Sequence, residues 1–346
     1  MKRLFVMAGV AVALLGAGGA SAGLFAQGGG LTTPKCPGGA LTSQAQISQD
    51  ACQQAYDIYQ LLSPQLGLAL AGGNATAGQG SVLGGIGHIS VGVRANVFDG
   101  LIPDVDKYPT PNPTGAVQRT LPTSSQWLGL PTADAAVGLF KGFPLALTNI
   151  LGVDALVSAA YIPTVNQNNV SITPNNNWQF GWGARVGLLS ESIVVPGVSF
   201  TWIDRDLPTT DITGQTNDQS TQFEITNLKV KTNAWRIVAS KSLVMFGIAV
   251  GGGQDKYTSS ADSIAATINT TVLNTPITGR GMVPDTKQDL TRTNIFLDLS
   301  FNLPVFKLVG EVGQASGGTV DTYNSFAGGR ADRSQAYGSL GIRLSW

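Results

Sequence analysis

The last residues of the chain alternate between two kinds of side chain. From Ser334 to Trp346, every second residue is apolar or small, and the residues between them are mostly polar. A period of two is the pattern of a β-strand whose two faces meet different surroundings. The strand ends on an aromatic residue, Trp346, which belongs to its apolar face. The apolar or small positions are Ala336, Gly338, Leu340, Ile342, Leu344 and Trp346, and the polar ones are Gln335, Tyr337, Ser339, Arg343 and Ser345.

Earlier segments repeat this alternation, and the clearest runs from Trp178 to Leu188, with two tryptophans and a phenylalanine on one face and glycines on the other. About eleven residues at about 3.3 Å each, tilted by about 45°, cover roughly the 25 Å apolar band of a membrane barrel. We predict about 10 strands, or 12 to 14 if Leu66–Gly85 or a loop contains a further hairpin. The other predicted strands are Gly87–Phe98, Thr132–Gly142, Gly152–Ile162, Ile193–Asp206, Gln222–Ser240, Leu243–Tyr257, Asp289–Leu303 and a segment from about Phe306 to Val312.

The connections between these segments differ in length in a regular way. Tight turns such as Ser190–Ser192 alternate with long polar loops, of which Asp99–Pro131, Leu207–Thr221 and Thr258–Lys287 are the clearest. Membrane barrels combine an even number of strands with short turns at one end and long loops at the other. The sequence therefore predicts an all-β fold, a transmembrane antiparallel up-and-down β-barrel that spans residues 86–346.

The composition agrees with membrane strands and excludes other classes of protein. Only 12% of the residues are charged, against about 25% in typical soluble domains. After the N-terminal region, the chain has no run of about 20 apolar residues that could form a transmembrane helix. The formal net charge is zero and we find no basic patch, so nucleic acid is not an expected partner.

The first residues have the features of a secretory signal peptide. Lys2 and Arg3 supply a positive charge, Leu4–Leu15 is an apolar core, and Ala20-Ser21-Ala22 is a small-residue cleavage site. We expect residues 1–22 to be removed, with cleavage after Ala26 as the second choice. The alternative is that this segment stays as a membrane anchor.

Residues 23–85 form a second predicted unit that contains one helix. Apolar residues recur at spacings of three and four from Ser43 to Leu62, a capping box fits Ser43–Gln46, and Pro64 should end the helix. The helix could lie in the barrel lumen as a plug, or below the barrel as a periplasmic cap. The Gly- and Ala-rich segment Leu66–Gly85 could be a hatch in the lumen or a plain linker.

The chain has two cysteines, Cys36 and Cys52, which we expect to form a disulfide in an exported protein. The bond would close a loop of about 16 residues and stabilise the fold by roughly 3 kcal/mol in the chain-entropy model. Two thiols and the single His88 do not make a ligand set for a metal. We therefore expect no metal and no cofactor.

A set of ionisable residues falls on the face of the strands that would line the lumen. These residues could pair with one another and with water and so fill a narrow barrel, or they could line a permeation path. The lumen-facing candidates are His88, Arg94, Asp134, Asp154, Arg185, Arg236, Asp298, Lys307, Glu311 and Arg343. On the opposite face, the tryptophans near strand ends suit an aromatic membrane girdle, and they are Trp178, Trp182, Trp202 and Trp346.

Catalytic chemistry has little support in the sequence. His88 is the only histidine, and Ser90 shares its predicted face, as an acyl-handling barrel enzyme would require. However, no third residue that could orient the histidine is marked by its spacing. We expect a structural role for His88 and no enzymatic activity.

From Gly80 onward the chain resembles the single-chain β-barrels of bacterial outer membranes. Its closing strand with a terminal aromatic residue is similar to the signal that the barrel-assembly machinery reads, so this machinery and outer-membrane lipid are the expected partners. The Gly- and Ala-rich segment before the first strand resembles the hatch of the FadL fatty-acid transporters. That resemblance implies a fourteen-stranded barrel with a lumenal N-terminal hatch that gates the passage of hydrophobic compounds. The Asn-Pro-Ala motif usual in that hatch is not found here, and fewer strands are predicted.

These observations predict a small outer-membrane barrel for the passage or binding of small, hydrophobic or amphiphilic solutes. The alternative is a barrel that transports nothing and serves as a structural or surface-exposed protein. An acyl-handling enzyme is the third candidate.

Overall fold

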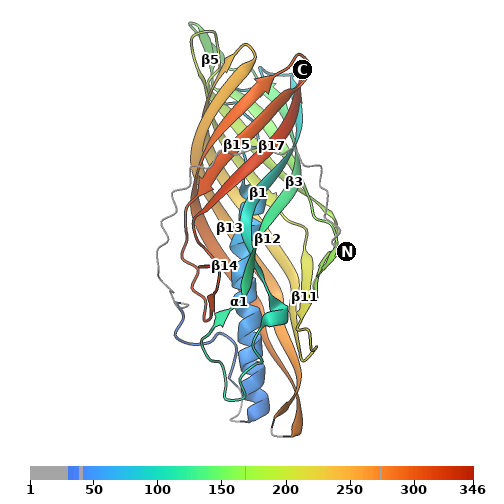
Figure 1. Ribbon diagram of the computed structural model, residues 1–346. Coiled ribbons are helices and arrows are strands. Elements are labelled where there is room, and N and C mark those ends of the chain that lie inside the picture. The colour runs from blue at the N-terminus through green and yellow to red at the C-terminus, as the bar shows by residue number, and fades with distance from the viewer. Residues whose placement is uncertain (1–29, 39–41, 168, 273) are drawn as a thin grey trace.

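The computed structural model of the chain describes residues 30–38, 42–167, 169–272 and 274–346. The predicted signal peptide lies outside the described residues. A barrel of antiparallel strands surrounds one end of a long axial helix, and several strands continue far beyond that end of the barrel (Figure 1).

The helix α1 (Ser43–Ala71) comes first and is followed by strands, with one short 3-10 helix, η1 (Val105–Lys107), among them. The barrel strands are β1 (Ile89–Pro103), β3 (Thr123–Phe140), β6 (Gly152–Tyr161), β9 (Trp178–Leu189), β10 (Gly197–Asp206), β12 (Thr221–Leu243), β13 (Phe246–Val272), β14 (Thr275–Asn302), β15 (Lys307–Ala315) and β17 (Gln335–Ser345). The smaller strands are β2 (Thr120–Leu121), β4 (Phe143–Leu145), β5 (Thr148–Ile150), β7 (Val165–Gln167), β8 (Val170–Pro174), β11 (Thr210–Gln215) and β16 (Ser325–Phe326).

The barrel strands form a closed antiparallel ring in which β17 pairs with β1 and β10 pairs with β12. The ring has ten strands, which confirms the predicted fold class and the lower of the predicted strand numbers. A closed ring leaves no free strand edge, which is the condition for a sheet to cross a bilayer. The closing strand pairs with the first one along the register from Ser90–Ser345 to Phe98–Tyr337.

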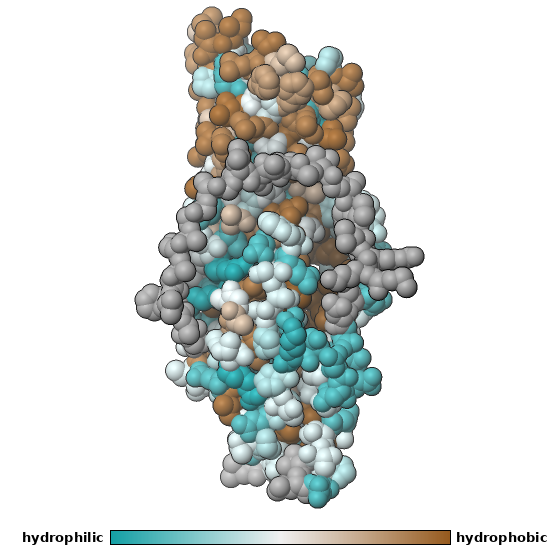
Figure 2. Space-filling view, viewed as in Figure 1, coloured by the Kyte–Doolittle hydropathy of each residue, from teal (hydrophilic) through white to brown (hydrophobic). Residues whose placement is uncertain are grey.

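Side chains alternate across the ring as the sequence pattern predicts. On β9, Trp178, Phe180 and Trp182 are exposed, whereas Arg185 and Gly187 on the other face are buried. Figure 2 shows the outward apolar side chains gathered around one end of the molecule, while the other end is mostly hydrophilic. The apolar end is therefore the part of the barrel that contacts lipid.

The two ends of the barrel differ in their connections. At the lipid-facing end, β12 and β13 are joined through Val244 and Met245, and the chain also ends there, with Trp346 and Ile89 exchanging two backbone hydrogen bonds. In bacterial barrels the short turns and both chain ends lie on the periplasmic side. We therefore call this end periplasmic and the opposite end outer.

The strands continue well beyond the lipid-facing band. β13 and β14 contain 27 and 28 residues, whereas a membrane strand needs only about 9–11. The prediction of a loop over Thr258–Lys287 is wrong, because both strands run through most of it. In the extension the outward face meets water, and the apolar face is the one that packs on α1, where Ile264, Ala266 and Ile268 are buried. The outward apolar pattern that marks a membrane strand therefore does not continue there. We call this outer part of the sheet the extension.

The other long loops are also more ordered than the sequence predicts. The segment Asp99–Pro131 holds the end of β1 and the first half of β3, and Leu207–Thr221 holds β11. β11, β8 and β7 form a branch that pairs with the outer half of β12, where β10 has already ended. This branch was not predicted, because its strands are short and have no clear alternation.

The helix lies in the lumen, so the plug is the correct one of the two predicted positions. Its N-terminal half is surrounded by the extension and its C-terminal end lies inside the barrel (Figure 1). The predicted end at Pro64 is wrong, since the helix continues to Ala71. Pro64 cannot donate to the carbonyl of Gln60. The side chains of Ser63 and Gln65 bond to the adjacent carbonyls of Tyr59 and Leu61, at 2.8 and 2.9 Å.

The N-cap of the helix lies one residue before the predicted one. The N-cap is Thr42, whose hydroxyl accepts a hydrogen bond from the Ala45 backbone N–H at 3.3 Å. Ser43 is therefore the first helical residue and not the cap. Among the described residues, no helix has both the length and the apolarity required to cross a bilayer.

Candidate functional site

The C-terminal end of α1 is held by arginines of the barrel wall. Arg236 donates from its two terminal nitrogens to Gly73 O at 2.6 Å and to Ala71 O at 2.5 Å, and Arg94 donates to Gly72 O at 2.7 Å. The last carbonyl groups of a helix lack partners within the helix and carry its partial negative charge. Guanidinium groups at this position therefore satisfy the carbonyls and neutralise the charge of the helix end.

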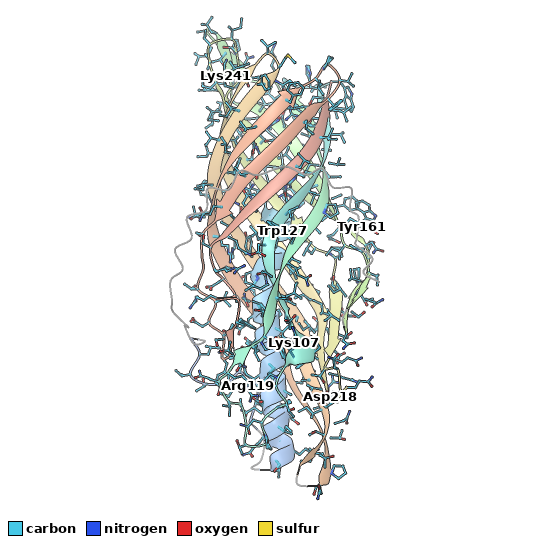
Figure 3. The ribbon with its side chains drawn as sticks, in the orientation of Figure 1. Lys107, Arg119, Trp127, Tyr161, Asp218 and Lys241 are labelled. Atoms are coloured by element: carbon cyan, nitrogen blue, oxygen red, sulfur yellow. A yellow bond between two sulfur atoms is a disulfide. The ribbon has the colours of Figure 1, made fainter. Side chains whose placement is uncertain are left out.

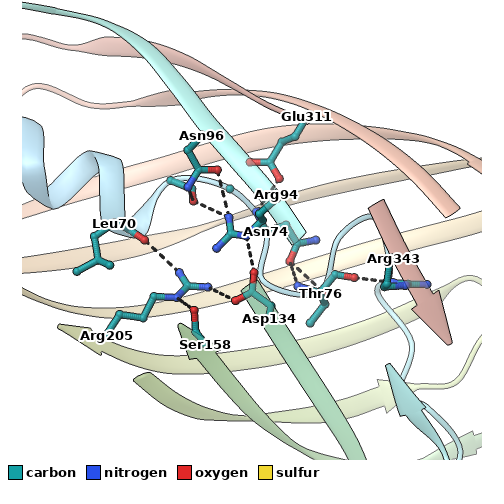
Figure 4. A network of polar contacts seen from close by, with 12 residues as sticks. Leu70, Asn74, Thr76, Arg94, Asn96, Asp134, Ser158, Arg205, Glu311 and Arg343 are labelled. Carbon is teal, nitrogen blue, oxygen red and sulfur yellow. Dashed lines mark hydrogen bonds and ion pairs between the residues drawn. The ribbon is translucent and has the colours of Figure 1, made fainter. Parts of the chain in front are cut away.

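These arginines are themselves paired with carboxylates of neighbouring strands. Arg94 lies 2.6 Å from Asp134, and Arg236 lies 3.2 Å from Asp255. Arg205 also reaches Asp134, at 3.4 Å, and bonds to Ser158 (Figure 4). Because each buried charge has a partner and further hydrogen bonds, the network can remain ionised inside the barrel.

The segment that follows α1 is bonded to the wall along its length. The backbone N–H of Asn74 donates to Glu311 at 2.6 Å, and that of Gly78 donates to Asp298 at 3.1 Å. Arg343 donates to the carbonyl of Thr76 at 2.6 Å (Figure 4). We refer to α1 and residues 72–83 together as the plug.

Nearer the periplasmic end, an ion pair of the wall holds the last part of the plug. Arg185 and Asp154 lie 2.6 Å apart and are both fully buried. Asp154 accepts the backbone N–H of Leu83 at 3.2 Å with each of its oxygens, and Arg185 donates to Gln79 O at 3.3 Å. The plug is thus fixed to the wall from the end of the helix to its exit from the barrel.

Glycines of the wall make room for the plug. A Cβ atom on Gly187 would lie 2.8 Å from Val82, and one on Gly281 would lie 2.2 Å from the carbonyl oxygen of Ser48. Gly187 of β9 and Gly281 of β14 therefore leave space that parts of the N-terminal segment occupy. The space left between the plug and the wall near Arg94 and Arg343 is about 20 Å³, roughly the size of one water molecule.

The outer half of α1 carries two buried carboxylates that organise the extension. Asp50 accepts the backbone N–H groups of Asn112 and Val117 and pairs with Arg119 at 2.8 Å. Burial raises the pKa of Asp50 above its ordinary value, and these hydrogen bonds and the Arg119 charge oppose the shift. The carboxylate thereby ties the loop between η1 and β2 to the helix.

Asp57 has the same role for the loop between β15 and β17. It accepts the backbone N–H groups of Tyr323 and Asn324 at 3.1 and 3.0 Å, as well as side-chain bonds from Asn324 and Gln53. Burial raises the pKa of Asp57 to about 7, against the effect of these donors. No cation pairs with Asp57 among the salt bridges of the described residues.

The structure places most of the predicted lumen residues against the plug or beside a residue that touches it. His88 lies before β1 with an exposed side chain at the periplasmic end, and Lys307 lies half-buried at the start of β15. Ser90 shares a hydroxyl hydrogen bond with Ser345 at 3.2 Å. The residues in contact with the plug or paired within the network are Arg94, Asp134, Asp154, Arg185, Arg236, Asp298, Glu311 and Arg343.

Three further buried charges of the ring strands were not among the predicted site residues. Arg205 and Asp255 belong to the network around the helix end, and Arg292 is buried with its guanidinium 6.0 Å from the centre of the Tyr257 ring. All three follow the inward alternation of their strands. The strand pattern alone would therefore have identified them.

The predicted disulfide and tryptophans have clear places in the fold. Cys36 and Cys52 form a disulfide beside the first turns of α1. Trp182 packs edge-on against Trp202 with ring centres 4.9 Å apart, and Trp178 lies 4.9 Å from Tyr161. Trp346 is exposed at the periplasmic end, so the tryptophans lie toward both ends of the lipid-facing band.

The extension contains a cleft of about 580 Å³ at the side of α1. We call it the outer cleft. Its floor is a stripe of the helix, Ala55, Ile58 and Leu62, and apolar residues of the branch and of β12 form one wall. β1 and β3 form the opposite side, and Asp104, Asp106 and Lys107, of which Figure 3 labels Lys107, bring charge to the rim. The apolar residues of the branch side are Val165, Val170, Ile172, Ile212, Phe223 and Ile225.

No protein-family model matches the chain, and no curated protein matches its sequence. Solved structures that are similar to it are outer-membrane β-barrels. One is Ail, the attachment invasion locus protein of Yersinia pestis, at 9% identity over 75% of this chain and 99% of Ail, with a TM-score of 0.29. Another is the translocator domain of the autotransporter NalP from Neisseria meningitidis, at 12% identity over 87% of this chain and 99% of that domain, with a TM-score of 0.35. A FadL homologue of Pseudomonas aeruginosa has 7% identity over 79% of this chain and 96% of its own, with a TM-score of 0.26.

The closed antiparallel ring and its lipid-facing apolar band make this chain a transmembrane β-barrel. The FadL resemblance implies fourteen strands, whereas this ring has ten.

Proposed function

We propose that this protein binds small amphiphilic solutes in the outer cleft and does not conduct them through an open lumen. The observation that carries the proposal is the contrast between two spaces. The outer cleft measures about 580 Å³, within the usual range for small-molecule sites, whereas the pocket beside the plug near Arg94 and Arg343 measures about 20 Å³. An apolar floor below a charged rim suits a molecule with an apolar body and a polar end.

The second candidate is a structural or surface-exposed barrel that binds no solute. It is supported by the hydrogen bonds that fix the plug, including those of Arg94, Arg236 and Arg343 to its carbonyls. The two candidates make opposite predictions for the outer cleft. Only the first requires an amphiphile to bind there.

Gly214 on β11 offers a way to fill the outer cleft without disturbing the fold. A Cβ at this position would have Val105 and Val170, both lining the cleft, as near neighbours at 3.8 Å, so a larger side chain has space to enter the cleft. Gly310 on β15 is a matched control, because nothing lies within 4 Å of its Cβ position and its neighbours Leu308 and Val312 on that face are exposed.

The test is the binding of dansyl-undecanoic acid to the protein in nanodiscs, followed by dansyl fluorescence and corrected with empty nanodiscs. We expect saturable binding that Gly214→Phe weakens by at least about tenfold, since each methylene kept out of an apolar site costs about 0.8 kcal/mol. Gly310→Phe should bind the probe as the unchanged protein does. Equal binding by all three proteins, or no saturable binding by any of them, would contradict the proposal.

A further inference from the structure

The wall of the extension is open on one side of the outer cleft. Within the membrane, β3 is followed in the ring by β6, β9 and β10. β6 ends at Tyr161 and β10 ends at Asp206, so these strands do not continue into the extension. There the wall continues from β12 through β11 and β8 to β7, and β7 pairs only with β8 among the described residues. The wall of the extension is therefore interrupted between β3 and β7. Gln126 of β3 and Val165 of β7 both line the cleft.

The outer half of β3, Thr123–Pro131, has a strand partner on one side only. It pairs with β1 along an unbroken register from Pro103–Thr123 to Ala95–Pro131, whereas the pairing of β3 with β6 begins at Thr132. In the described part of the chain no other strand pairs with this half. An edge of this kind presents a row of unpaired backbone donors and acceptors.

The residues that point to the free side can be identified from the pairing. In an antiparallel pair, residues alternate between directing both backbone groups to one neighbour and directing both to the other. Gly138 donates its N–H to His88 O at 2.9 Å, so the even-numbered residues of β3 face β1. It follows that Ser125, Trp127 and Gly129 direct their N–H and C=O groups to the free side.

A proline in the same stretch agrees with this assignment. Pro131 is odd-numbered, so its missing N–H falls on the side away from β1 and removes no bond from that ladder. Prolines in sheets are confined to such positions.

We propose that the ligand of the outer cleft is an extended amphiphilic peptide from another polypeptide, which pairs with the free edge of β3 as an added strand. The inference rests on the proposed function, since it names the ligand class of the same site. The backbone of the peptide bonds to Ser125, Trp127 and Gly129, and its alternate apolar side chains lie over Ile58 and Leu62. An alkyl amphiphile could fill the apolar floor but would form no bonds with these backbone groups, whereas a peptide would contact the floor and pair with the edge.

The charge at the rim sets a preference among peptides. Asp104 and Asp106 lie beside Lys107 at the mouth of the cleft, and Lys107 is paired with Asp104 at 3.1 Å. Asp106 forms no salt bridge among those of the described residues. The rim therefore favours a peptide whose polar residues are basic over one whose polar residues are acidic.

The first test uses a fluorescent peptide of alternating lysine and valine, about nine residues long, which matches the free half of β3 at about 3.3 Å per residue. Its binding to the protein in nanodiscs is measured by fluorescence anisotropy. The matched control is the same sequence N-methylated at every second residue, which removes the donors of one edge but keeps the side chains and charge. We expect the methylated peptide to bind at least about tenfold more weakly. Equal binding of the two peptides would overturn the proposal.

The second test changes the protein edge and leaves the cleft intact. Trp127→Pro removes an N–H that the β1 ladder does not use, and Trp127→Ala serves as the control for loss of the exposed indole. We expect Trp127→Pro to weaken peptide binding by about tenfold relative to Trp127→Ala, with heat-modifiable gel migration showing that both variants form the barrel. Equal affinities of the two variants would contradict pairing at this edge.

The outcomes separate this inference from the proposed function. If dansyl-undecanoic acid binds and the lysine–valine peptide does not, the peptide inference is wrong and the binding of amphiphiles remains. If neither probe binds, both the peptide inference and the proposed function are wrong. If sedimentation shows a dimer that Trp127→Pro dissociates, a second copy of this chain occupies the edge, and the inference is wrong.

Discussion

The two halves of α1 are held in place by opposite chemistry. At the inner end, arginines of the wall bind carbonyl groups at and just beyond the last turn, as Arg236 does with Ala71 and Gly73. In the outer half, the helix itself supplies the charge, and Asp50 and Asp57 accept backbone N–H groups of the surrounding loops. The inner contacts depend on guanidinium groups, which stay charged at any ordinary pH. The outer contacts depend on buried carboxylates, whose charge is sensitive to pH.

The inner half of α1 closes the barrel, and the outer half shapes the surface. The inner end and residues 72–83 fill the ring where it is closed and surrounded by lipid. The outer half forms the floor of the outer cleft and orders the loops around it. A change at the inner end should therefore affect closure of the lumen, and a change in the outer half should affect the surface.

The largest effect is expected from removing the plug. Deletion of residues 30–83 would leave the ten-stranded ring with a lumen lined by ionised side chains such as Arg94, Asp154 and Arg236. Water and ions should enter this lumen, and single-channel recording in planar bilayers should show conductance that the complete protein lacks. A variant that migrates as a folded, heat-modifiable barrel but stays silent would contradict the assignment of closure to the plug.

A smaller but still large effect is expected from a single arginine at the inner end. Arg236→Met would leave Asp255 buried without its cation and free two carbonyls of the plug, at a cost of about 3–5 kcal/mol in the free energy of unfolding. Arg119→Met in the outer half should cost only about 1–2 kcal/mol, because Asp50 keeps two backbone donors. The midpoints of urea unfolding, followed by heat-modifiable migration, measure both. Equal losses would contradict the difference between the two halves.

The smallest effect concerns the response of the outer half to pH. The pKa of Asp57 is about 7 in the folded protein, against an ordinary 3.8. Between these two values the folded protein keeps a proton that the unfolded chain has lost, so this contribution to stability is present at low pH and is lost as the pH rises through about 7. Hydrogen exchange of the Tyr323 and Asn324 amides, corrected for intrinsic rates, measures the free energy of local opening. We expect this free energy to be lower at about pH 8 than at about pH 5, by up to a few kcal/mol.

Asp57→Asn is the control for this pH response. The variant has no titrating group at the position and should show the same opening free energy at both pH values, whatever its absolute stability. If the variant keeps the pH dependence of the unchanged protein, another group causes it.

The sequence predicts the membrane part of this fold far better than the extension. Where lipid lies on one side of a strand, alternation is strict, and the positions of all ring strands and of the inward charges Arg94, Arg185 and Arg236 follow from it. Beyond the membrane, water replaces lipid on the outward face and the apolar residues of β13, such as Ile264 and Ile268, point to the helix. The outward apolar pattern therefore stops, and the outer halves of β13 and β14 read as a loop. The helix could be recognised from its spacing, but its continuation past Pro64 depends on packing inside the barrel.

The outer cleft could not be predicted from local pattern. Its sides come from β1, β3, η1, β7, β8, β11 and β12, and they meet on the helix stripe of Ala55, Ile58 and Leu62. These elements come together because β11 pairs with β12 beyond the end of β10. Pairing between strands that are distant in sequence cannot be predicted from local pattern. The arginine network has a more local signal, since Arg205 and Asp255 also lie at inward positions of recognisable strands.

The direction of α1 has a consequence for the order in which the molecule is assembled. The helix enters the lumen from the outer end, and beside its first turns a disulfide closes a loop between Cys36 and Cys52. The loops held by Asp50 and Asp57 widen this end further. The lumen of a completed ring is only wide enough for the helix. The wider end with the disulfide-closed loop therefore cannot pass through it. The ring must therefore close around a helix that is already in place.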